Sequence, residues 1–163
     1  MSRGLGDVYK RQVIGEAMLT MQTERGKRAI IAEAYRLLRA GGTYSIHELG
    51  LQPDDLPEPV KDEVRKALAR SIKVNARPLT EKEWRELLES EGFEVLWSGK
   101  EPMALLDMRR NLADEGLGGV LRILRNMLGN KDIRARVMNM KSTFHKYSKE
   151  LNGIAFVVRK PAK

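Results

Sequence analysis

The residues best suited to chemistry are Glu16, His47 and Glu48, because each lies at the end of a run typical of a buried strand. An imidazole exchanges protons near neutral pH, and a carboxylate accepts hydrogen bonds or binds a cation. Ligands of open parallel sheets bind at the carboxyl ends of the strands. We therefore predict a site formed by residues 15–18 together with His47 and Glu48. Two structural alternatives stay open, since His47 can be a hydrogen-bonded strand-end residue and Glu16 can cap the following helix.

The elements that would position these residues follow from hydrophobic periodicity and from helix-ending signals. Basic Arg39 followed by Gly41 and Gly42 suits a left-handed cap at the end of the first helix. Strand, helix and strand in this order predict a right-handed parallel crossover, and hence an α/β fold. In chain order we expect strand 13–15, helix 23–39, strand 43–49, helix 59–74, a helix starting at a capping box at 80–83, strand 93–97, a helical region over 102–150 and strand 153–159.

The composition excludes several kinds of chemistry. The 163 residues contain no cysteine and two histidines, so disulfides, thiolate metal sites and cysteine nucleophiles are absent from the sequence. His145 has no second ligand at metal-binding spacing, and we predict no metal site. No apolar run is long enough for a membrane span or a signal peptide, and we expect a cytoplasmic, single-domain protein without membrane contact.

Three segments together resemble class I S-adenosylmethionine-dependent methyltransferases. The run Leu37-Leu38-Arg39-Ala40-Gly41-Gly42 resembles the stretch before their fifth strand, although the family usually has proline where this chain has Ala40. Residues 91–95 resemble the turn into the sixth strand, and residues 153–159 resemble the seventh strand. The resemblance spans roughly residues 13–160. It implies a partial Rossmann-like methyltransferase sheet, made of strands four to seven with the last strand antiparallel between the fifth and sixth, and helical insertions at about 53–76 and 102–150.

The resemblance also implies S-adenosyl-L-methionine as cofactor, yet the family's main binding elements have no match. The family binds this cofactor through a glycine-rich loop after strand one and an acidic residue after strand two. Neither element precedes Val13, and Gly4 and Gly6 follow no strand. We therefore expect residues 13–163 to be the C-terminal part of a methyltransferase domain (EC 2.1.1.-), inactive as written and with weak or no cofactor binding.

Carried over from the family, residue roles fall on the two predicted strand ends. Glu16, Ala17 and Met18 would lie beside the methionine portion of the cofactor. His47 and Glu48 would face a small-molecule methyl acceptor, where His47 can take a proton and Glu48 can orient the acceptor. Some members of the family use no general base, so no residue is predicted to be essential. Met and aromatic residues within 102–150 suit either a lid over the acceptor or ordinary helix packing.

The start of the chain has a different character from the rest. Residues 1–12 show no amphipathic period and resemble a translated remnant of sequencing adapter. We interpret them as a non-native leader that replaces upstream residues of the natural protein. In the complete fold, the strand at 13–15 would pair with strand one of the family. Its open edge predicts self-association.

A second hypothesis places the chain in a different class, a non-enzymatic basic module that binds nucleic acid or an anionic surface. Residues 109–149 hold ten Lys or Arg against three Asp or Glu. Such a patch attracts anions over long range, but it is equally typical of solvated helix faces. Few aromatic residues for base stacking accompany the basic residues, and no nucleic-acid motif occurs, which argues against a nucleic-acid partner.

Overall fold

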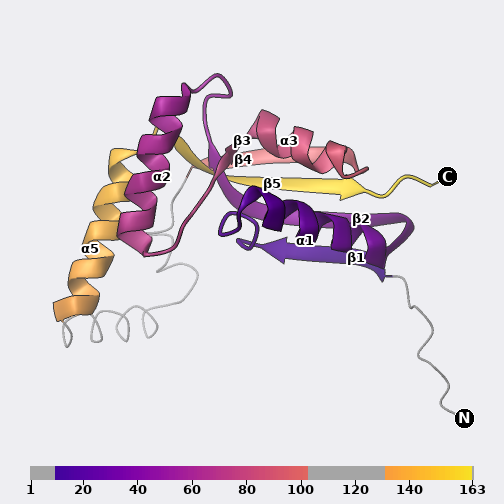
Figure 1. Ribbon diagram of the computed structural model, residues 1–163, viewed down its shortest axis with the longest axis horizontal. Helices are drawn as coiled ribbons and strands as arrows, with labels where there is room; N and C mark the ends of the chain where they lie inside the picture. The colour runs from indigo at the N-terminus through magenta and orange to yellow at the C-terminus, as the bar shows by residue number, and fades with distance from the viewer. Residues whose placement is uncertain (1–9, 103–130, 163) are drawn as a thin grey trace, which may run out of the picture.

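One mixed sheet organises the molecule. A computed structural model describes residues 10–102 and 131–162. The sheet has the order β1-β2-β5-β4, with β3 pairing with the end of β2. β1 is parallel to β2, whereas β5 is antiparallel to both β2 and β4 (Figure 1). The strands are β1 (Lys10–Glu16), β2 (Leu38–Leu51), β3 (Leu79–Thr80), β4 (Glu94–Pro102) and β5 (Leu151–Arg159). The predicted α/β class and the antiparallel last strand between its two neighbours are confirmed.

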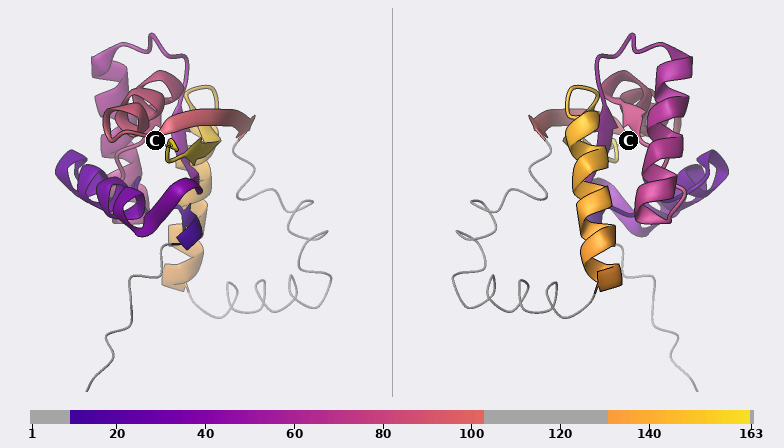
Figure 2. Two further views of the ribbon diagram at one scale, coloured as in Figure 1. Left: turned by 90° about the vertical axis from the view of Figure 1, so that its right-hand side faces the viewer. Right: turned by 90° about the vertical axis from the view of Figure 1, so that its left-hand side faces the viewer.

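Four described helices connect or flank the strands: α1 (Glu24–Leu37), α2 (Glu58–Ile72), α3 (Glu81–Ser90) and α5 (Lys131–Lys146). Thr23 caps α1 by accepting a hydrogen bond from Gly26 N. The predicted capping box of α3 is confirmed, because Thr80 and Glu83 each accept the other's backbone N–H. α1 and α3 lie on the same face of the sheet, and α2 and α5 lie beside each other near one end of it (Figures 1 and 2).

The core has two parts. The larger part lies between the sheet and the two helices α1 and α3, and its buried members include Ile31, Tyr44, Trp84, Phe93 and Phe156. The smaller part joins α2 to the residues after α5 and to the ends of β2 and β5, with Leu51, Val64, Leu68, Tyr147 and Leu151. Tyr44 of β2 belongs to the larger part and Leu51 to the smaller part, so β2 is packed both before and after His47 and Glu48 along its length.

The predicted end of the first helix is wrong. α1 ends at Leu37, and its C-cap residue Leu38 is extended and fully buried. Burial of Leu38 draws the chain into β2 at once, so no left-handed glycine closes the helix. Gly41 does have a φ of 76°, but within β2, where its N–H donates to Lys160 O at 2.8 Å.

Other boundaries differ less. β1 begins at Lys10, three residues before the predicted strand, so Lys10 and Gln12 of the predicted leader pair with β2. The origin of those residues stays a prediction. α2 lies within the predicted insertion at 53–76 and α5 within that at 102–150. Residues 103–130 of the predicted helical region, with its candidate lid residues from Met103 to Met127, lie outside the described residues.

Candidate functional site

The carboxyl end of β1 lies beside β2, as predicted, but β2 continues past His47 and Glu48 to Leu51, so these two residues do not end the strand. Glu16 stands opposite His47 in the parallel register. The next residue continues the contact, because Ala17 N donates to His47 O at 2.8 Å. The structure thus brings Glu16, Ala17 and His47 together at the carboxyl end of β1.

The side chains of His47 and Glu16 form an exposed pair. His47 Nδ1 lies 2.7 Å from Glu16 Oε1, and the two side chains are 56% and 70% exposed. A carboxylate that accepts from Nδ1 favours the tautomer with its proton there, which leaves Nε2 as a proton acceptor. The open alternative that Glu16 caps α1 does not hold, because Thr23 is the cap. The pair has the composition of a general-base dyad.

Glu48 points the other way, into the interior. It is 3% exposed, and its carboxylate accepts from the backbone N–H groups of Met18, Leu19 and Thr20 at 2.8–3.0 Å. The Thr20 hydroxyl donates to the same carboxylate at 2.6 Å. Bonds from several donors to one ionised acceptor are stronger than neutral ones. The structure gives Glu48 the role of anchoring the loop after β1, and its predicted contact with an acceptor substrate stays a prediction.

The anchored loop presents some side chains outward and buries others. Leu19 and Thr20 are buried, whereas Met18 and Met21 are 44% and 39% exposed. Ala17 has a φ of 49°, in the left-handed region that side chains other than glycine seldom adopt. Strained backbone of this kind persists where the surroundings fix it, and here the Glu48 bonds follow directly. Ala17 and Met18 are thereby held at the surface beside the His47–Glu16 pair.

A buried lysine ties this loop to the rest of the molecule. Lys27 is 2% exposed, and its Nζ donates to Gln22 O at 3.0 Å and to Arg77 O at 2.9 Å. Burial, and then the nearby Arg77 charge, lower the pKa of Lys27 to about 8. Arg77 N in turn donates to Thr20 O at 2.8 Å. The loop is therefore held by the Glu48 side chain from β2 and by the contacts of Lys27 and Arg77 with Gln22 and Thr20.

Sequence reasoning missed Lys27, although a signal was available. Lys27 lies four residues before Ile31 and seven before Ala34, and all three face the core from α1. A charged residue on the buried stripe of an amphipathic helix needs a dedicated set of partners. That spacing would have identified Lys27 as a candidate.

Two kinds of feature are absent from the described part of the chain. Residues 10–102 and 131–162 contain no group of three His, Cys, Asp or Glu placed to hold a metal ion. Over the same residues, no helix has the length and apolar character needed to cross a membrane.

Solved structures of known proteins share this fold. A mycolic acid cyclopropane synthase complexed with S-adenosylhomocysteine (SAH) matches 91% of this chain and 55% of the synthase chain, with a TM-score of 0.65 and 15% identity. A cyclopropane synthase from Mycobacterium tuberculosis has the same TM-score and coverage at 13% identity. Phosphoethanolamine N-methyltransferase 2 of Haemonchus contortus, also in complex with SAH, matches 93% of this chain and 33% of the methyltransferase chain, with a TM-score of 0.58 and 17% identity. The fold is that of the class I S-adenosylmethionine-dependent methyltransferases.

The sequence comparisons add a relative but no activity. An uncharacterised protein of Haemophilus influenzae is 32% identical over 148 residues, which cover 91% of this chain and 57% of that protein. No protein-family model matches the sequence. The chain spans about half the length of the relative and of the two cyclopropane synthases. The comparisons do not favour the alternative hypothesis of a basic binding module.

Proposed function

We propose that this chain forms the acceptor-side half of a methyltransferase domain that uses S-adenosyl-L-methionine to methylate a small molecule. The observation that carries the proposal is the His47–Glu16 pair beside an anchored loop, at the sheet end where this fold class places its ligands. The fold neighbours crystallised with SAH support the cofactor assignment.

The side chains exposed at this end suit the methionine portion of the cofactor. Met18 and Met21 offer apolar surface, and the exposed Glu16 carboxylate can accept from an ammonium group. Residues 16–18 would therefore line that portion, as the sequence predicts. The glycine-rich loop and the ribose-binding acid have no counterpart in this sequence. We propose that other residues of a longer protein supply this loop and this acid.

The residues present can remove a proton from the methyl acceptor and align the acceptor with the methyl group. S-adenosyl-L-methionine supplies, when bound, an electrophilic methyl group. His47 Nε2 takes the proton that an acceptor O–H or N–H loses, and Glu16 stabilises the resulting imidazolium through Nδ1. Glu48 fixes the loop backbone, so that the groups that align acceptor and methyl do not move apart.

The edge of β1 is proposed as a surface for self-association. Within the described residues, β1 pairs with β2 alone, and Ile14 is 70% exposed. A groove of about 330 Å³ beside it is lined by apolar residues that include Val13, Ile14, Met18 and Ile30. An unpaired edge next to apolar surface is a ready template for pairing with another strand.

We also propose a cytoplasmic location for the protein.

Calorimetric titration with SAH tests the proposed function. The titration compares this 163-residue chain with the longest native reading frame that encodes it. We expect micromolar binding by the longer protein and weak or no binding by the shorter chain, because the shorter one carries one wall of the cofactor site. Absence of binding by both forms would contradict the methyltransferase assignment.

A further inference from the structure

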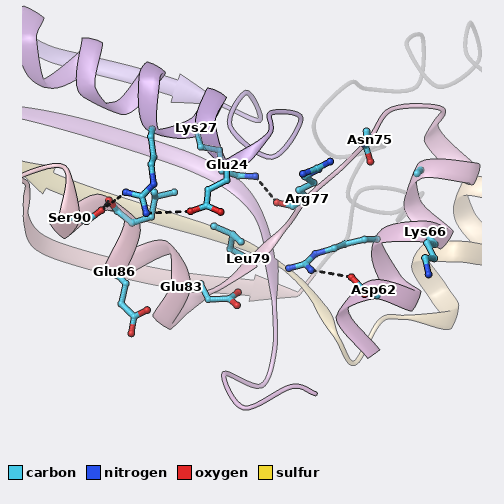
Figure 3. Close-up of a pocket in the computed structure, with 14 residues that line it drawn as sticks. Glu24, Lys27, Asp62, Lys66, Asn75, Arg77, Leu79, Glu83, Glu86 and Ser90 are labelled. Carbon is cyan, nitrogen blue, oxygen red and sulfur yellow. Dashed lines mark hydrogen bonds and ion pairs between the residues drawn. The ribbon is translucent and has the colours of Figure 1, made fainter. Parts of the chain in front are cut away.

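A second cavity lies apart from the His47–Glu16 pair. It has a volume of about 810 Å³ and is lined by side chains from α1, α2 and α3 and from residues 75–79. Figure 3 shows Lys27, Lys66, Arg77 and Leu79 around this space. None of the residues predicted to form the methyl-transfer site lines it. The volume lies in the range of small-molecule sites.

The acidic residues that line the cavity already have cationic partners. Glu24 lies 3.4 Å from Arg28, and Asp62 lies 3.4 Å from Arg65. Glu83 lies 2.6 Å from Lys61 and accepts from the Thr80 N–H of the capping box. Glu86 lies 3.9 Å from Lys82. Each carboxylate of the lining therefore already lies beside a cation other than Lys66 or Arg77.

Three cations of the lining lack an acidic partner among residues 10–102 and 131–162. Lys66 and Arg77 form no ion pair there and are exposed, whereas buried Lys27 donates only to backbone carbonyl oxygens. The positive charge of Arg77 acts against that of Lys27 and contributes to the lowered pKa of Lys27. An anion beside the Arg77 guanidinium would relieve this repulsion and accept hydrogen bonds from the guanidinium.

We propose that this cavity binds a small molecule that carries a phosphate group. The Arg77 guanidinium offers a planar fork suited to phosphate oxygens, and Lys66 and Lys27 add two further positive charges. A phosphate dianion matches this surplus better than a single carboxylate does. Ala69, Leu79 and Leu87 supply apolar surface for the organic part of the ligand. The inference does not depend on the proposed methyl transfer.

The cavity is connected to the loop that Glu48 anchors. Lys27 Nζ donates to Gln22 O, and Arg77 N donates to Thr20 O. A ligand that contacts the Lys27 and Arg77 side chains therefore contacts the two residues that brace the loop after β1.

Calorimetric titration of the purified chain with pyrophosphate tests this proposal, with Arg77→Gln as the main variant. The backbone of Arg77 carries its bonds to Thr20 and Lys27, so the variant removes only the side-chain charge. We expect submillimolar binding at physiological salt and a weakening of about tenfold or more in Arg77→Gln. Lys66→Gln, on the exposed side of α2, gives a second loss of the same kind.

Arg134→Gln is the matched control, because it removes one exposed arginine from α5, which does not line the cavity. It should leave pyrophosphate affinity unchanged within about twofold. Melting temperatures of all three variants show whether each still folds. The proposal is overturned if the chain does not bind pyrophosphate, or if Arg134→Gln weakens binding as much as Arg77→Gln does.

Discussion

His47 and Glu48 are neighbours in β2, yet they belong to different regions of the molecule. Successive side chains of a strand point to opposite faces of a sheet. Glu48 shares the helix-covered face with Tyr44 and Ile46 and is buried, whereas His47 lies on the other face and is exposed beside Glu16. The covered region fixes the loop backbone through Glu48, and the exposed region holds the His47–Glu16 pair that we propose as the proton acceptor. Two adjacent residues of β2 thus serve the support and the proposed chemistry.

The largest effect is expected from Glu48→Gln. The amide keeps the shape of the side chain but loses its charge, and its N–H₂ group opposes either the Met18 and Leu19 donors or the Thr20 donors, depending on which oxygen it replaces. We expect the free energy of unfolding to fall by about 3 kcal/mol, because buried donors lose a charged acceptor. Urea denaturation followed by circular dichroism measures this change.

Glu16→Gln is the matched control, since it makes the same chemical change at an exposed glutamate beside His47. We expect it to alter the free energy of unfolding by less than about 0.5 kcal/mol. Equal losses in the two variants would show that Glu48 does not anchor the loop in the way described.

The second effect concerns Lys27 and the pH dependence of stability. The pKa of Lys27 in the folded chain is about 8, below its ordinary value of 10.5. Between these values the unfolded chain binds more protons, so the contribution of Lys27 makes the free energy of unfolding rise with pH. Arg77 and Arg65 oppose its charge, while Glu48 and Glu24 favour it. We expect a rise from about pH 8 to about pH 10 in the unmodified chain and a flatter profile in Lys27→Met. Thermal denaturation across this pH range checks the prediction, and identical profiles would contradict it.

The sequence predicted the regular parts of this fold well, because regular elements leave regular patterns. The strand character of residues 43–49 and the capping box at Thr80 predicted the corresponding strand and helix, whereas the strand order was implied by the family resemblance. The end of α1 was predicted wrongly because Gly41 serves β2 rather than a helix cap.

The sequence predicted that Glu16 and His47 meet, but not how the residues around them are arranged. The meeting of Glu16 and His47 follows from parallel pairing. By contrast, nothing periodic in residues 16–22 indicates that Leu19 and Thr20 turn inward, so the anchoring role of Glu48 was not foreseen. The inward direction of Glu48 follows from its alternation with Tyr44 and Ile46, but the partners that it meets there belong to the loop after β1, which has no repeating pattern.

A third effect tests the open edge of β1. Ile14→Lys places a charge on the exposed strand next to the apolar groove. If the edge pairs with a second copy, the unmodified chain sediments as a dimer or larger species, and the variant sediments as a monomer. Analytical ultracentrifugation separates these outcomes. A monomeric unmodified chain would rule out self-association through this edge.

The smallest effect on stability is expected from His47→Gln. Its side chain is more than half exposed, and exposed ion pairs contribute little. We expect a change in the free energy of unfolding below about 0.5 kcal/mol, measured by the same urea denaturation. A loss close to that of Glu48→Gln would mean that His47 is structural and that the two regions are not distinct.

The most direct test of the central claim is where SAH binds. Amide spectra recorded by NMR during titration with SAH, on the form of the protein that binds it, locate the contact residue by residue. The account predicts that the largest shifts fall on residues 16–21 and on His47, with smaller shifts at Lys27 and Arg77. Shifts confined to α5 or to the cavity between α1, α2 and α3 would contradict the assignment of this sheet end as the methyl-transfer site.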